Sequence, residues 1–183
     1  MYLTNKPKSP EYHMIYKEYK KASQRHYHTC YFLLSEIKDS MNTIDAPLQK
    51  KILENIYYLS GYIIECGLSY AFFKVINYDA AKSVYDLDSN NSFSLTFEDY
   101  IRKHGHEYND RKIQVILARG GQKASEIEKI TKLTPSDILH QMYTAWNTDS
   151  RYTTQHLDFD LNRNNVEAFF DLAKEVFTTA RKI

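Results

Sequence analysis

The sequence has little of the two residues that interrupt regular structure: only 5 Gly and 4 Pro occur among its 183 residues. β-sandwiches and barrels need many turns, and these residues form a large share of turns, so their scarcity disfavours both architectures. The composition is otherwise ordinary for a globular protein, with 43% hydrophobic and 26% charged residues. We therefore predict one domain, residues 1–183, built from long helices.

Cysteines, excess charge of one sign and long apolar runs are also lacking. The two cysteines, Cys30 and Cys66, lie in apolar helical patterns without zinc-ligand spacing, so we expect buried free thiols. The 24 Lys and Arg nearly balance the 23 Asp and Glu, which excludes an overall positive field that attracts nucleic acid. No apolar run reaches the roughly 18 residues of a membrane span, and residues 1–10 have no apolar leader. We expect a cytoplasmic protein with no membrane partner.

Apolar periodicity predicts an all-α fold. Apolar or semi-polar residues recur every three or four positions from Ile15 to Ile37, which predicts a helix over about 11–42. The segment from Pro47 to Ile76 is apolar on more than one face, so we predict that it is the central helix. The short connection between these helices favours antiparallel neighbours.

Cap residues and turn residues predict several shorter helices. One opens at Thr134 as N-cap and ends near Trp146, and the last opens at Asn164. The others are expected over 80–85, 96–103 and 110–118. Between residues 146 and 164 the apolar residues Leu157, Phe159 and Leu161 alternate with polar ones, which predicts a packed, extended connection.

The central segment resembles a known family signature. Its residues are Tyr58-Leu-Ser-Gly-Tyr-Ile-Ile-Glu-Cys-Gly-Leu-Ser69, and they are similar to the second helix of HEPN domains (higher eukaryotes and prokaryotes nucleotide-binding domains). Ser69 departs from the pattern, in which a lysine is common. Two further elements follow in the family's order: Lys103-His104-Gly105-His106-Glu107, and Trp146 followed by Arg151-Tyr152. Residues 122–133 then read as an insertion.

The resemblance implies an antiparallel four- or five-helix bundle with short extra helices, and it suggests functional residues. Many HEPN proteins are metal-independent ribonucleases that use an arginine and a histidine, separated by four to six residues, across a dimer cleft. Arg151 and His156 fit this spacing and are the candidate catalytic pair, with His156 moving the proton of a ribose 2′-hydroxyl. The candidate binding residues are His104, His106, Glu65 and Tyr152.

Arg151 also has a structural interpretation, which we favour. Glu65 lies inside an apolar helix, where a carboxylate needs a cation, and Arg151 would supply one. His104 and His106 stand beside Glu107, but no further ligand is spaced to complete a metal site, so we expect no metal and no cofactor. In the first helix Tyr16 and Tyr19 interleave with Lys17 and Lys20 as an RNA surface would, although tyrosines at helical spacing more often lie in a core.

Three functions remain open. The first is a module that binds RNA or a nucleotide, or a partner protein such as a nucleotidyltransferase, without cutting RNA. The second is an endoribonuclease of the defence or toxin type that works as a homodimer through Arg151 and His156. The third is a helical assembly subunit, which a large dry interface would support.

Overall fold

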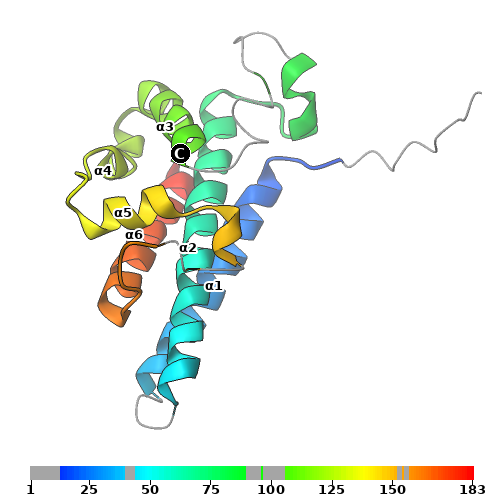
Figure 1. Cartoon of the computed structure of the whole chain (residues 1–183). Coiled ribbons are helices and arrows are strands. Elements are labelled where there is room, and N and C mark those ends of the chain that lie inside the picture. Colours follow the sequence, from blue (N-terminus) through cyan, green and yellow to red (C-terminus); the bar gives the residue numbers. More distant parts are fainter. Residues whose placement is uncertain (1–12, 40–43, 90–95, 97–105, 152–153, 155–156) are drawn as a thin grey trace, which may run out of the picture.

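The chain folds into a helical bundle in the computed structural model, which describes residues 13–39, 44–89, 96, 106–151, 154 and 157–183, with the backbone alone for 88, 89, 106, 107 and 151. No strand occurs among these residues, so the all-α prediction is confirmed (Figure 1). The α-helices are α1 (Lys17–Asp39), α2 (Ala46–Val75), α3 (His106–Gly120), α4 (Glu128–Thr131), α5 (Ile138–Ala145) and α6 (Arg163–Lys182). Short 3₁₀ helices are η1 (Val84–Ser89), η3 (Gly121–Ala124) and η4 (Thr148–Arg151).

The central helix α2 has well-defined ends. Asp45 is its N-cap, with Oδ1 accepting a hydrogen bond from the Leu48 amide at 2.8 Å, and Pro47 lies in the first turn. At the other end Asn77 adopts a left-handed conformation, with φ 53°. The amide of Asn77 bonds the Lys74 carbonyl and the amide of Tyr78 bonds the Phe73 carbonyl, which is a Schellman motif. These caps bound the helix close to the predicted limits.

Two long helices, α1 and α6, pack along α2. The chain runs in opposite directions in these two helices. The α1 helix is antiparallel to α2, because its early residue Ser23 bonds the Ile63 carbonyl at 3.0 Å and its later residue Cys30 reaches back to Ile56. The α6 helix is parallel to α2: Phe169 packs on Tyr57, and further along both helices the backbone of Phe177 lies against Gly67. Figure 1 shows α1 beside α2, with α6 at a tilt to both helices. The predicted antiparallel pairing therefore holds for α1 and α2, whereas α6 returns through a long connection.

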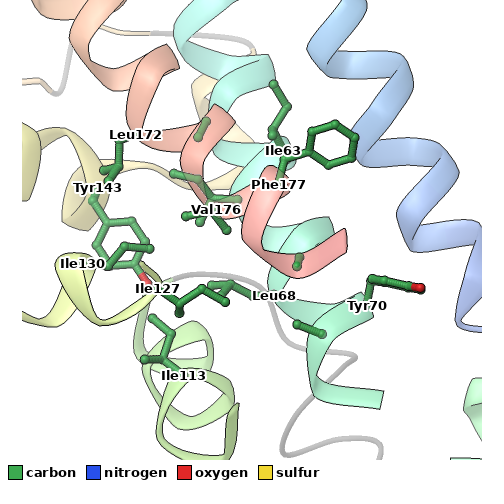
Figure 2. Close-up of a cluster of buried hydrophobic side chains, with 14 of the residues drawn as sticks. Ile63, Leu68, Tyr70, Ile113, Ile127, Ile130, Tyr143, Leu172, Val176 and Phe177 are labelled. Carbon is green, nitrogen blue, oxygen red and sulfur yellow. The ribbon is translucent and has the colours of Figure 1, made fainter. Parts of the chain in front are cut away.

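The apolar core lies between α2, α6 and the shorter helices. Cys30 is buried as predicted, whereas Cys66 is half-buried. Ile63, Phe170 and Phe177 are buried, and Leu33 and Leu59 are half-buried. Figure 2 shows side chains from α2, α3, α6 and the segment around α4 in one cluster. The segment 122–133 belongs to this core, since its Ala124, Ile127 and Ile130 are buried.

Several predicted helix limits were wrong, and local hydrogen bonds explain most of the shifts. The α1 helix begins at Lys17 and not near residue 11, and residues 13–16 before it are not helical. Asp137 bonds both the amide and the hydroxyl of Thr134, which closes a turn and leaves Asp137 itself as the extended N-cap of α5. Asn162 caps α6 through the Asn165 amide, two residues before the predicted cap.

The remaining predicted segments have mixed outcomes. A 3₁₀ helix over Val84–Ser89 replaces the helix expected at 80–85, and α3 is longer than expected at both ends. The helix expected over 96–103 falls almost wholly outside the described residues. The alternation is confirmed over 157–161, because Leu157, Phe159 and Leu161 are half-buried while Asp158 and Asp160 are exposed. The start of the connection is not extended as expected, since η4 occupies Thr148–Arg151. None of the helices in the described part of the chain is long and apolar enough to cross a membrane.

Candidate functional site

The predicted catalytic pair lies largely beyond what the structure describes. Arg151 ends η4, but its side chain is not among the described atoms, and Tyr152 and His156 lie outside the described residues. His104 lies outside them too, and His106 begins α3 with its backbone alone described. The proposed contacts of Arg151, with His156 or with Glu65, therefore stay predictions.

Glu65 does lie within a described polar cluster between α2, α3 and α5. Lys112 of α3 is fully buried, at 0% exposed, and its Nζ donates to Ser69 Oγ at 2.9 Å and to Asn109 Oδ1 at 3.4 Å. Glu65 lies one helical turn before Ser69 on α2 and is 5% exposed. The Tyr143 hydroxyl of α5 donates to Asp110 at 3.3 Å beside them. A lysine from another helix thus supplies a cation at Ser69, where the HEPN pattern has its own lysine.

Burial dominates the titration of this cluster. It lowers the pKa of Lys112, while the negative charge of Glu65 and the Cys66 thiol act in the opposite direction. Burial raises the pKa of the Cys66 thiol to about 12, with a further contribution from Glu65. Cys66 is therefore protonated at neutral pH, and a protonated thiol is a poor nucleophile. The hydrogen bond from Lys112 to Ser69 joins α3 to α2.

A second contact joins two elements of the family-like pattern. The Trp146 indole donates its N–H to the Tyr58 carbonyl at 3.0 Å and meets the Tyr62 ring edge to face, with centroids 5.1 Å apart. A Cβ on Gly61 would lie 2.1 Å from indole ring atoms, so only glycine admits the ring. Tyr58, Gly61, Tyr62 and Trp146 therefore act as one packing unit, which gives these motif positions a structural reason.

An open pocket of about 510 Å³ is lined by residues from the C-terminal ends of α2, α3 and α6. Three cationic side chains line it: Lys74 from the last turn of α2, Arg119 from the last turn of α3, and Lys123 from η3. Its other lining residues are Val75, Asn77, Gly120, Gln122 and Ile183. None of these described lining side chains is acidic. We call this hollow the basic pocket.

Two turns shape the basic pocket. Asn77, in a left-handed conformation, ends α2 three residues after Lys74 and turns the chain out of the helix. Gly121, with φ +56°, turns the chain from α3 into η3, and Lys123 of η3 lines the pocket together with Arg119 of α3. A neighbouring hollow along α6 differs in charge, because Glu126, Asp171 and Glu175 line it together with Lys174 and Lys182.

Sequence reasoning missed the basic pocket. Its cations are far apart in the chain, and Gly120-Gly121 lacks the lysine that follows the glycines of a phosphate-binding loop. The available signal was the presence of Lys74 and Arg119 at helix C-termini, which is common for electrostatic reasons alone. Among the described residues, no three His, Cys, Asp or Glu side chains gather as metal ligands.

Comparisons with known proteins give no match for this chain among family models, curated proteins or solved structures.

Proposed function

We propose that this chain is a HEPN-like binding module whose ligand carries phosphate groups, an RNA or a nucleotide, and that it does not cut RNA. The observation that carries the proposal is the basic pocket, in which three cations and no acidic side chain surround about 510 Å³. This volume suits a mononucleotide or a short stretch of RNA backbone, since small-molecule sites measure roughly 300–1,000 Å³.

Helix dipoles explain only part of this positive charge. The C-terminus of a helix carries about −0.5 of an elementary charge, so the ends of α2, α3 and α6 together supply about −1.5. Lys74, Arg119 and Lys123 nevertheless bring positive charge to the pocket. Because none of its described lining side chains is acidic, this charge favours an anionic ligand. Asn77 and Gln122 add amide groups that can donate hydrogen bonds to phosphate oxygens.

The sequence of the first turns of α6 supports a module without nuclease activity. In the family the catalytic arginine and histidine lie at the head of a helix, and Arg163 is the first residue of α6. The positions where a histidine would follow with the family's spacing hold Ala168, Phe169 and Phe170, and α6 contains no histidine. Phe169 and Phe170 are buried. This leaves Arg151 and His156 as the one pair on which cleavage would rest.

A binding titration tests the pocket. Fluorescence anisotropy with a labelled single-stranded RNA, and competition by ATP, AMP and inorganic phosphate, would distinguish RNA from free nucleotide. The double variant Lys74→Gln/Lys123→Gln should weaken binding by about tenfold or more, and for RNA it should flatten the slope of log Kd against log salt by about 1.4. Lys174→Gln is the matched control, because it removes a cation from the neighbouring hollow along α6 and leaves the basic pocket intact. Equal binding by the double variant and the wild type would overturn the pocket's role.

A cleavage assay tests the alternative, the metal-independent endoribonuclease. The purified protein is incubated with total RNA, with and without chelator, beside His156→Ala. We expect intact RNA in every sample. Cleavage that survives chelator, disappears in His156→Ala and leaves 2′,3′-cyclic phosphate ends would contradict the proposal and establish the nuclease.

A further inference from the structure

The outer face of α1 carries a stripe of six exposed residues with an ordered change of character. From the N-terminal end they are Lys21, Arg25, His28, Phe32, Glu36 and Asp39, and all six are exposed. The stripe is therefore basic at one end, aromatic in the middle and acidic at the other end. Phe32 is 59% exposed and the adjacent Tyr31 is 61% exposed, which is high for aromatic residues at the surface of a folded domain.

The stripe is a true helix face. With 3.6 residues per turn, the six positions fall within an arc of about 80° and span about 27 Å along the axis. Ser23, Cys30 and Ile37, which are buried against the rest of the bundle, lie on the opposite side of α1. The stripe thus points directly away from the core, and no described part of the chain covers it.

The charges on this face remain available for a partner. Among the described residues, the side chains of Arg25, Glu36 and Asp39 have no ion-pair partner within the chain. Lys21 pairs with Glu18 at 2.7 Å, but both side chains are exposed, and such a pair contributes little. A surface with charges of both signs at opposite ends suits a partner with the reverse order of charges.

We propose that the partner is a second copy of this chain, which docks its own α1 antiparallel on this stripe. A two-fold axis that crosses α1 near the level of residue 30 brings Arg25 beside Glu36 of the second copy and Lys21 beside Asp39 of the second copy. The same contacts recur on the other side of the axis, so four ion pairs flank the His28 and Phe32 rings at the centre. A parallel arrangement would oppose like charges at both ends of the stripe.

The size of the contact sets the expected strength. A helix pair about 27 Å long and about 10 Å wide is smaller than a standard interface, which buries about 800 Å² per partner. The dimer should therefore be weak, with a Kd in the micromolar range, and salt should weaken it because its ion pairs are exposed. This dimer is independent of the basic pocket, which lies at the end of the bundle.

Charge reversal tests the dimer in the full chain. Sedimentation velocity from about 1 to 500 µM would give the Kd of each variant. Arg25→Glu alone and Glu36→Arg alone should each weaken self-association at least tenfold, because each opposes like charges across the axis. An equimolar mixture of the two variants should associate as the wild type does, and so should the double variant Arg25→Glu/Glu36→Arg. Lys38→Glu reverses a charge on α1 outside the stripe and is the control.

Cysteine cross-linking tests the direction of pairing. Under mild oxidation Lys21→Cys should not cross-link to itself, since about 27 Å separates it from the matching site in an antiparallel pair. A mixture of Lys21→Cys and Asp39→Cys should cross-link. Self-cross-linking of Lys21→Cys would overturn the antiparallel arrangement. A monomer at every concentration, or self-association unchanged by the single reversals, would overturn the interface itself.

Discussion

The two sides of α2 are held in different ways. On the side of α1 and α6 the contacts are apolar rings and close helix approach, with the small polar groups Ser23 and Cys30 bonded to α2 carbonyls. On the side of α3 and α5 the contacts are directional: Lys112 bonds Ser69, the Tyr57 hydroxyl bonds the Met142 carbonyl at 2.9 Å, and the Trp146 indole bonds the Tyr58 carbonyl.

The difference shows how one helix can be both a core element and a positioning element. Apolar contacts tolerate small slides of one helix on another, whereas a buried hydrogen bond requires its partner at one place. The hydrogen bonds on the α3 and α5 side therefore fix where these shorter helices sit on α2. The predictions below test this division.

The largest effect is expected at Lys112. Lys112→Ala removes the buried ammonium that faces Glu65 and takes the donor away from Ser69 and Asn109, so it should cost about 3–5 kcal/mol in the free energy of unfolding. Urea unfolding followed by circular dichroism measures this loss. Lys112→Met/Glu65→Gln, which removes both charges and keeps most of the volume, should recover part of it. A stability equal to that of the wild type in Lys112→Ala would show that the polar side contributes little.

A smaller loss is expected at Gly61. Gly61→Ala places a Cβ against the Trp146 indole, and the forced shift should cost about 1–3 kcal/mol. Trp146 is the only tryptophan, so its fluorescence should move to longer wavelength as the ring leaves its site. Urea unfolding gives the free energy. An unshifted emission spectrum with unchanged stability would contradict the fit of ring and glycine.

Cys30, on the α1 side of α2, should make the free energy of unfolding depend on pH in the alkaline range. Burial raises the pKa of this thiol to about 12, and a hydrogen bond with Ser60 only partly opposes the shift. The folded state keeps the proton when the unfolded chain loses it near pH 9, so the thiol's contribution is complete below pH 9 and disappears between about pH 9 and 12.

Comparison with Cys30→Ala isolates this contribution. The wild type should lose about 1.4 kcal/mol more than the variant when the pH rises to one unit above the ordinary thiol value, as measured by urea unfolding. The tyrosines titrate in both proteins and cancel in the difference. Identical pH dependence in the two proteins would mean that the thiol is not held protonated by burial.

The smallest effect is expected at Gly67, on the apolar side of α2. A Cβ there would lie 3.4 Å from Val176 Cγ1, an ordinary contact, and alanine favours the helix by up to about 1 kcal/mol. Gly67→Ala should therefore leave stability unchanged or slightly higher in the same urea titration. A loss as large as that of Gly61→Ala would remove the contrast between the two sides.

The sequence predicted those features that depend on local pattern. Pro47 marked the start of α2, and the alternation of Leu157, Phe159 and Leu161 correctly predicted that these three side chains pack against the core. Lys112 shows the limit of this reasoning, because a lysine in an amphipathic helix is normally exposed, and its burial here depends on Ser69 and Glu65, which another helix brings to it. The cations of the basic pocket could not be grouped either, since the relative placement of α2, α3 and η3 depends on tertiary packing.

The parallel course of α2 and α6 has a consequence for synthesis of the chain. The α1–α2 hairpin consists of contacts between neighbouring segments, which form early. The α6 helix leaves the ribosome after all the other helices, although it covers the flank of α2 that carries Tyr57 and Gly67. During translation that apolar flank therefore faces solvent or a chaperone, and the nascent chain is most prone to aggregation in the interval before α6 emerges.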